Sequence, residues 1–235
     1  MSTIWFGRAI LSVYDKEGIV ELGALLAKLK VEILSTGGTA QVLRDHWVPV
    51  IEVSKYTGSP EILGGRVKTL HPKIAGGILV PQTGLGVEEA FRHGFSPIDL
   101  VVVNLYPFSE TVAKEGVTVD EAMEQMDIGG VTMVRAGAKN HKYVTVVTHP
   151  SQYPALMAEL EHTSRTRSSG NGGVSTETRK TLAALALQHT ARYCAAEAEY
   201  LARLVPAGVR PAVLPGPCRG LLQRCSGSTA RPFFD

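Results

Sequence analysis

The sequence predicts an α/β protein built on a mostly parallel sheet, because short apolar runs alternate with amphipathic segments from residue 8 to about 150. The strongest strand is Ile98–Leu105, whose apolar stretch indicates a place inside the sheet, covered on both faces. The 235 residues, 44% of them hydrophobic and 20% charged, suffice for a buried core without disulfides or a structural metal. A chain that is disordered throughout is excluded.

The first half of the chain predicts three strands separated by two helices. Arg8–Val13 is the first strand, and apolar residues at spacings of three and four then indicate a helix. That helix face comprises Ile19, Leu22, Leu26 and Leu29, and Asp15 is placed to cap the helix. A strand, a helix and a strand follow over 31–34, 39–46 and 49–53. Residues 54–77 are rich in glycine and proline.

The second half continues the alternation. Helices are expected near 108–115, 119–126 and from about 129, followed by a strand over 143–148 and a helix over 150–160. Thr163–Ser175 is rich in Ser, Thr, Gly and Asn, which predicts a solvated loop. A last helix from about Thr176 should bury one face, formed by Leu182, Leu185, His189, Tyr193, Ala196 and Tyr200. One domain over residues 1–200 is expected.

Residues 201–235 differ from the rest in composition and charge. They contain five Pro, four Gly, five Arg, one acid and no Lys, a net charge of +4 that leaves −2 for residues 1–200. No periodicity is present, so we predict an irregular tail. Because the folded part is mildly acidic, a nucleic-acid interface is not expected.

The composition also limits the cellular compartment and the kinds of catalytic site that we expect. No apolar run approaches the roughly 18 residues that span a bilayer, and Met1–Arg8 lacks the pattern of a secretory signal, so we expect a cytoplasmic protein without membrane contact. The three cysteines, Cys194, Cys218 and Cys225, form neither a disulfide framework nor a zinc motif. The histidines lack metal-ligand spacing, and no Gly-x-Ser-x-Gly elbow occurs. We predict no metal site and no Ser or Cys nucleophile.

Two loops at predicted strand ends have the composition of a phosphate site. Ser12–Lys16 follows the first strand and Ser35–Thr39 follows the second, and together they offer hydroxyls, two glycines and a lysine. The carboxyl ends of parallel strands share one edge of the sheet, where helix N-termini attract anions. Taken singly, the second loop could be a plain turn in which Thr39 caps a helix. As neighbours, the two loops indicate anion binding.

Three further segments carry reactive side chains, each with a simpler structural alternative. Gly64–Pro72 places Arg66 and Lys68 in a loop, which could be an ordinary solvated basic turn. Tyr106 follows the strongest strand, where it could be a core tyrosine. Asp127 could cap a helix, and Lys139 could complement the dipole of a helix C-terminus.

In order and spacing, these segments resemble the cyclohydrolase domains of the bifunctional purine biosynthesis proteins, from about Arg8 to Tyr200. The resemblance is carried by six motifs: Ser-Val-x-Asp-Lys, Ser-Thr-Gly-Gly-Thr, Gly-Arg-Val-Lys-Thr-Leu-His-Pro, Val-Val-Asn-Leu-Tyr-Pro-Phe, Asp-Ile-Gly-Gly and Ala-Lys-Asn-His. It implies a methylglyoxal-synthase-like, three-layer α/β domain with a mostly parallel central sheet. It also implies IMP cyclohydrolase activity, which closes FAICAR to IMP with loss of water and uses no cofactor or metal.

The resemblance also implies which residues form the site. By motif position, the catalytic residues would be Lys68, Tyr106, Asp127 and Lys139. The substrate-binding residues would be Ser12, Lys16, Thr36, Gly37, Gly38, Thr39, Arg66, Thr69, Asn104 and Gly129. The implied partner is a purine nucleotide, FAICAR or IMP, and a homodimer stays open as an option.

The chemistry suits these residue types. A carboxamide nitrogen is a weak nucleophile, so ring closure needs alignment, removal of a proton and donors for the departing oxygen. Lys68 and Tyr106 are assigned to the proton relay, and Asp127 with Lys139 to orienting the carboxamide. The separation of Asp127 and Lys139 opposes this assignment, because they are twelve residues apart and would lie roughly 18 Å from each other in an unbroken helix. Either the helix is interrupted, for example at Gly137, or the two residues touch opposite ends of the site.

Departures from the family leave alternatives open. Tyr14 stands where the family usually has a serine, and Ala75 replaces a common histidine. The transformylase motifs of the family are not found, and residues 201–235 resemble nothing in it, so formyl transfer is not expected. A nucleotide-binding module of the same fold is the second hypothesis. Methylglyoxal synthase is a third, which the purine-type motifs disfavour.

Overall fold

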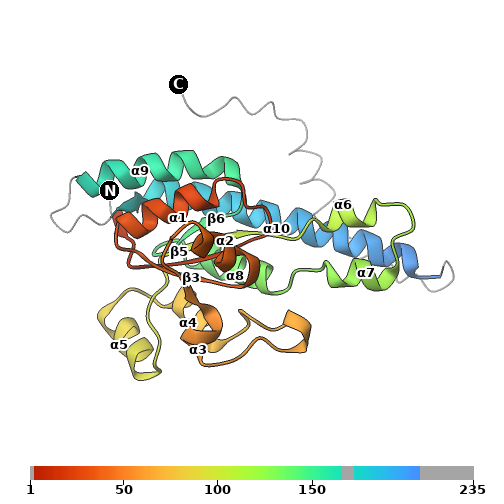
Figure 1. Cartoon of the computed structure of the whole chain (residues 1–235), viewed down its shortest axis with the longest axis horizontal. Helices are drawn as coiled ribbons and strands as arrows, with labels where there is room; N and C mark the ends of the chain where they lie inside the picture. The colour runs from red at the N-terminus through yellow and green to blue at the C-terminus, as the bar shows by residue number, and fades with distance from the viewer. Residues whose placement is uncertain (1–2, 166–171, 207–235) are drawn as a thin grey trace. The chain divides into compact units, whose positions relative to one another are not determined.

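The computed structural model describes residues 3–165 and 172–206 (Figure 1). Contacts divide the chain into one compact unit that ends at Glu197 and a second that begins at Ala198, and the fold and site below belong to the first unit. The last helix runs to Leu204, and residues 207–235 of the expected tail lie outside the described residues. The division at residue 200 therefore stays a prediction.

Five parallel strands form the central sheet, in the order β4-β3-β2-β5-β6. The middle strand β2 (Arg8–Val13) pairs with β3 (Glu32–Ser35) on one side and with β5 (Leu100–Asn104) on the other, and β4 (Ile51–Glu52) and β6 (Thr145–Val147) are the edges. Leu11 is level with Ser35 and Val13 with Asn104, so β2, β3 and β5 end at the same edge. The prediction that β5 lies inside the sheet is confirmed.

Helices cover both faces of this sheet, which confirms the predicted three-layer α/β architecture (Figure 1). One face is covered by α1 (Ile19–Lys28), α2 (Gly37–Asp45) and α9 (Tyr153–Arg165). The other is covered by α4 (Pro72–Leu79), α8 (Gly129–Lys139) and α10 (Thr176–Leu204). Ile19, Leu22 and Leu26 of α1, at spacings of three and four, are fully buried, as the periodicity requires.

Two predicted helix starts were wrong. Asp15 does not cap α1, because the helix begins after Gly18 at a left-handed φ of 67°, and the Asp15 carboxylate instead accepts the Glu17 N–H at 2.9 Å. Thr39 does not cap α2, which begins two residues earlier with Thr36 at its N-cap position. The Thr39 hydroxyl instead donates to Val13 O at 2.9 Å and accepts Val13 N–H at 3.1 Å.

The glycine- and proline-rich region over 54–77 contains regular structure. Helix α3 (Val53–Thr57), the 3₁₀ turn η1 (Leu63–Gly65) and α4 lie within or across it. The start of α4 has a recognisable signal, since His71 Nδ1 accepts the Lys73 N–H at 3.1 Å and Pro72 occupies the first turn. Helix α5 (Gly84–Arg92) was not predicted, and its N-terminus is capped by Thr83.

The predicted solvated loop over 163–175 is also wrong at both ends. Helix α9 continues to Arg165, and β7 (Gly173–Ser175) pairs antiparallel with β1 (Thr3–Trp5). Val174 of β7 is fully buried in the core beside α9. The sequence hides this pairing because each strand has three residues and its partner lies about 170 residues away.

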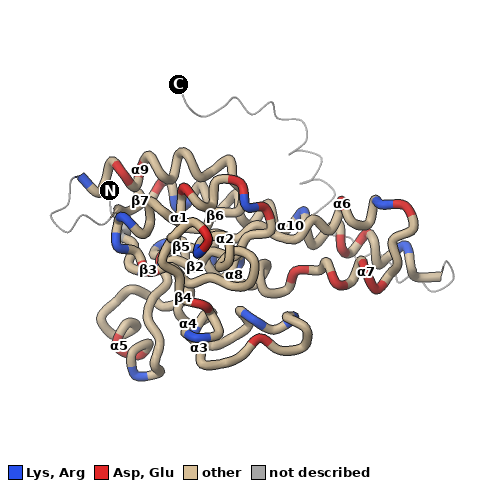
Figure 2. The backbone as a smooth tube through the Cα atoms, in the orientation of Figure 1, with Lys and Arg blue, Asp and Glu red and all other residues tan. Residues whose placement is uncertain are grey.

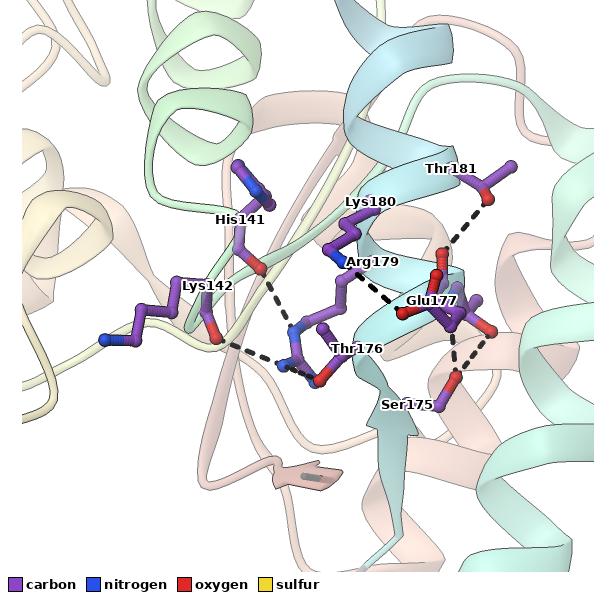
Figure 3. A network of polar contacts seen from close by, with 9 residues as sticks. His141, Lys142, Ser175, Thr176, Glu177, Arg179, Lys180 and Thr181 are labelled. Carbon is purple, nitrogen blue, oxygen red and sulfur yellow. Dashed lines mark hydrogen bonds and ion pairs between the residues drawn. The ribbon is translucent and has the colours of Figure 1, made fainter. Parts of the chain in front are cut away.

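Helix α10 is anchored near its start by a buried arginine (Figure 3). Arg179 is 1% exposed, and its guanidinium donates to His141 O (3.1 Å), Lys142 O (3.1 Å), Val174 O and Thr176 Oγ1 (3.2 Å). Burial lowers the pKa of Arg179, and these oxygens offset the loss of water around the charge. The predicted buried face of this helix is wrong at Leu185, which is 42% exposed.

Two short helices lie between β5 and α8. Helices α6 (Phe108–Val112) and α7 (Val119–Glu124) connect β5 to α8, and α7 starts with a capping box between Thr118 and Glu121. Acidic residues gather along this stretch (Figure 2). The turn η2 (Pro150–Gln152) leads into α9. None of the described helices is long and apolar enough to cross a membrane.

Candidate active site

A cleft of about 540 Å³ lies where β2, β3 and β5 end. Its walls come from the strand ends, the loop over 64–69 and the segment that joins α7 to α8. The lining residues are Ser12, Thr36, Gly64, Gly65, Arg66, Lys68, Thr69, Tyr106, Met123, Glu124, Gln125, Met126, Asp127, Ile128, Gly129, Gly130 and Met133. Segments more than 100 residues apart therefore meet at one edge of the sheet.

The cleft gathers most of the residues that the sequence singled out. Three of the four predicted catalytic residues line it: Lys68, Tyr106 and Asp127. The predicted substrate-binding residues in its wall are Ser12, Thr36, Arg66, Thr69 and Gly129. Ser12 Oγ and Thr36 Oγ1 are 3.3 Å apart, so hydroxyls from two neighbouring strand ends are ready to bind one anion.

Lys68 is placed by two glycines. Gly65 has a left-handed φ of 89°, and a Cβ there would lie 2.7 Å from Lys68 Cε, so a larger residue would displace the lysine. A Cβ on Gly37 would lie 3.6 Å from Lys68 Nζ, which puts the ammonium beside the first residue of α2. Lys68 Nζ also pairs with the Glu61 carboxylate at 3.2 Å. The ammonium and the α2 N-terminus together favour an anion at this spot.

A second ion pair joins two walls of the cleft. Arg66, in the 64–69 loop, binds the carboxylate of Glu124 at the end of α7 through Nη2 and, at 3.4 Å, through Nε. The hydrogen bond from Arg66 lowers the pKa of Glu124. The side chains are 68% and 54% exposed, so water screens the pair and an incoming phosphate can compete for the arginine.

Asp127 ends the connection into α8 and is held by the helix that follows. Its Oδ1 accepts the Gly130 N–H of the first turn at 2.6 Å, although the N-cap position of α8 is the next residue, Ile128. Burial raises the pKa of Asp127, and the bond from Gly130 partly opposes this. A Cβ on Gly130 would lie 2.5 Å from Asp127 Oδ2, and one on Gly129 would lie 2.6 Å from Thr69 Oγ1. Both glycines are therefore required by close packing around the cleft.

Tyr106 is not a core tyrosine. It is 42% exposed at the cleft, and its ring meets the edge of the Tyr14 ring at a centroid distance of 5.8 Å and an angle of 82°. Tyr14, the residue that departs from the resembled family, therefore packs against the Tyr106 ring. Edge-to-face contacts of this kind are favourable and restrict the rings.

Several predicted binding residues are engaged elsewhere. Lys16 Nζ donates to Val13 O and to Tyr14 O at 2.8 Å, and burial lowers its pKa. Asn104 Oδ1 accepts the N–H groups of Tyr14 (2.5 Å) and Asp15 (2.9 Å). Both side chains thus hold the loop after β2 in shape. Thr39, as described above, is bonded to β2, and Gly37 and Gly38 lie in the first turn of α2 without lining the cleft.

Lys139 does not join the cleft. It is the last residue of α8, an exposed position about 15 Å along the helix from Gly129, since each residue rises 1.5 Å. The helix is continuous through Gly137, which sits against β6 so closely that a Cβ would lie 2.5 Å from Val146 Cγ2. The alternative of an interruption at Gly137 is therefore wrong.

Several residues that shape the cleft were not predicted from the sequence. Glu61 and Glu124 pair with its two basic residues, and Met123, Met126 and Met133 supply its apolar wall. The Tyr193 hydroxyl of α10 accepts a hydrogen bond from the Asp127 N–H. Helical periodicity placed Tyr193 on a buried face, but no local motif connects it to Asp127, which lies 66 residues earlier in the chain. Among residues 3–165 and 172–206, no cluster of His, Cys, Asp or Glu is arranged to hold a metal.

The fold is a parallel sheet covered by helices on both faces, with a cleft at the strand ends, and the family model of the MGS-like domain matches residues 18–132. A second model, for the AICARFT/IMPCHase bienzyme, matches residues 137–215. Over these two segments the chain is similar to MGS-like domains and to the AICARFT/IMPCHase bienzymes, in agreement with the resemblance that its motifs carry. The match up to residue 215 corrects the expectation that nothing after residue 200 resembles the family.

Individual relatives show the same similarity. The chain is 52% identical over 201 residues to the bifunctional purine biosynthesis protein PurH of Neisseria meningitidis serogroup A, which covers 84% of this chain and 36% of that protein. It is also 52% identical over 199 residues to PurH of Anoxybacillus flavithermus, at 84% and 37% coverage. The crystal structure of ForH matches with a TM-score of 0.72 and 35% identity, covering 82% of this chain and 95% of ForH. The chain thus spans just over a third of the curated relatives it matches.

Proposed function

We propose that the chain is a purine-biosynthesis enzyme that closes FAICAR to IMP with release of water. The observation that carries this proposal is the convergence of Lys68, Tyr106 and Asp127 with the hydroxyls of Ser12 and Thr36 in one cleft. The names of the PurH relatives support purine biosynthesis as the pathway.

The phosphate of the nucleotide would bind at the strand ends. The Ser12 and Thr36 hydroxyls and the N-terminus of α2 supply donors there, and Arg66 is able to leave Glu124 for the phosphate. Fixing the phosphate fixes the position of the base, which turns ring closure into a reaction between aligned groups. The methionines of the wall offer an apolar surface to the imidazole ring.

Ring closure forms a bond from the carboxamide nitrogen to the formyl carbon, and the formyl oxygen finally leaves as water. The carboxamide nitrogen must lose one proton and the formamide N–H a second, and the oxygen must gain both as its bond to the formyl carbon breaks. We assign this relay to Lys68 and Tyr106, and orientation of the carboxamide to Asp127. Lys139 is left out of this assignment, because it lies at the far end of α8.

The test is a spectrophotometric assay of FAICAR cyclisation by the purified chain. We expect turnover by the wild type and a loss of at least about 10²-fold in Lys68→Met. Lys142→Met is the matched control, because Lys142 is exposed and its ammonium lies over the Tyr143 ring, 5.1 Å from the centroid. IMP binding without turnover would contradict the enzyme and support the nucleotide-binding module. Phosphate release from dihydroxyacetone phosphate would support methylglyoxal synthase.

A further inference from the structure

The wall of the cleft that carries Asp127 has little regular structure of its own. It is the short connection from Gln125 to Ile128, between the end of α7 at Glu124 and the start of α8 at Gly129. Connections like this rely on their backbone hydrogen bonds for a fixed shape. A change in this turn would move the Asp127 carboxylate relative to Lys68 and Tyr106.

The hydroxyl of Tyr193 binds this turn at two points. Tyr193 Oη accepts the Asp127 N–H at 3.0 Å and donates to Gln125 O at 2.8 Å. One side chain of α10 thus satisfies a donor and an acceptor of the turn at once. The ring is held in turn by Phe108 of α6, with centroids 6.3 Å apart and planes at 64°.

A second side chain on the same face of α10 is buried near Tyr193. Glu197 is one helical turn beyond Tyr193 and is 9% exposed. Its Oε1 has no hydrogen-bond partner in the part of the chain that the structure describes. Burial and the charge of Asp127 both raise the pKa of Glu197, so the Asp127 charge acts on this helix.

We propose that Tyr193 is a positioning residue of the active site, whose hydroxyl locks the 125–127 turn and thereby aims the Asp127 carboxylate into the cleft. The expected effect on turnover rests on the proposed function. The claim that Tyr193 fixes the 125–127 turn does not. Tyr193 lies in the segment that matches the bienzyme model, whereas Asp127 lies in the segment that matches the MGS-like domain. The bienzyme-type helix would therefore complete the cleft of the MGS-like domain.

The test compares Tyr193→Phe with Tyr56→Phe. Tyr193→Phe keeps the ring and its contact with Phe108 but removes both bonds to the turn. Tyr56 is the matched control, because its hydroxyl also has two partners, Ser96 N–H (3.3 Å) and Arg8 Nη1 (3.4 Å), but it does not line the cleft. Both variants should lose similar thermal stability.

Amide hydrogen exchange at Asp127 is the first readout, because it needs no activity. We expect the Asp127 amide to exchange about tenfold faster in Tyr193→Phe and at the wild-type rate in Tyr56→Phe. The second readout is the cyclisation assay, where kcat should fall about tenfold in Tyr193→Phe while KM changes less than about threefold.

Wild-type exchange at Asp127 in Tyr193→Phe would overturn the inference, and so would wild-type kcat. If the wild type itself does not turn over FAICAR, the proposed function fails, and hydrogen exchange alone decides the role of Tyr193. Should Tyr193→Phe not fold, 3-fluorotyrosine at position 193 keeps both bonds but makes the hydroxyl a poorer acceptor. Faster exchange of the Asp127 amide is then expected, and unchanged exchange would count against the inference.

Discussion

Replacement of the buried Arg179 by methionine should destabilise the fold more than any surface substitution. Methionine fills similar space but donates nothing, so the oxygens of His141, Lys142 and Val174 lose the guanidinium donors. A buried acceptor without a partner costs about 1–3 kcal/mol, and water can reach the two that are only partly buried. The expected loss in free energy of unfolding is therefore about 3–5 kcal/mol.

Urea denaturation followed by circular dichroism measures this loss, and a Tm decrease on the order of 10 °C should accompany it. Arg179→Lys keeps the charge but reaches fewer oxygens, so an intermediate loss is expected. Arg44→Met is the control, because Arg44 pairs with Glu52 at an exposed site and should contribute less than about 1 kcal/mol. If Arg179→Met unfolded within about 1 kcal/mol of the wild type, the carbonyl network would not be what anchors α10.

Three further outcomes follow from the cleft. Lys68→Met should lower turnover of FAICAR at least about 10²-fold with wild-type stability, whereas Lys142→Met stays within about twofold in the same assay. Gly130→Ala brings a methyl group to within 2.5 Å of Asp127 Oδ2 and should cost about 1–3 kcal/mol in urea denaturation, whereas Gly84→Ala, with open space at its Cβ, should cost less than about 0.5 kcal/mol. Asp127→Asn should gain stability relative to the wild type as pH rises. Burial raises the folded-state pKa of Asp127, so the folded wild type binds its proton more tightly than the unfolded chain and loses stability as pH rises through that pKa. Denaturation midpoints at about pH 4 and at neutral pH should show this divergence, and parallel pH profiles would contradict it.

Local patterns predicted the parts of the fold in which neighbouring residues determine the structure. Alternating apolar runs gave β2 and β5, and spacings of three and four gave α1, because burial imposes those periods directly. The β1–β7 pairing was missed because strand pairing depends on a distant segment. The buried face of α10 was wrong at Leu185, because an apolar pattern does not select the polar residues Arg179, Thr190 and Glu197 that are buried on this helix.

The candidate site was predictable from the sequence to about the same extent as the fold. Parallel strands end at one edge, so side chains that follow β2, β3 and β5 had to meet there, and Ser12, Thr36 and Tyr106 do. The sequence does not determine which way each side chain faces. Lys16 and Asn104 are of the right type and at the right edge, yet both satisfy backbone groups of the loop after β2.

The two matched segments contribute different things to the cleft. Residues 18–132 supply nearly all of the side chains that face it, but the turn that carries Asp127 leaves a backbone N–H and a carbonyl oxygen pointing away from the cleft. Such groups need partners when they are removed from water, and Tyr193, from the segment over 137–215, provides both. Because Arg179 fixes the start of the same helix to the turn after α8, the position of Tyr193 is set by a buried polar network as well as by apolar packing. If the proposed assignment holds, the position of Asp127 in the cleft depends on a helix that contributes no side chain to the cleft wall.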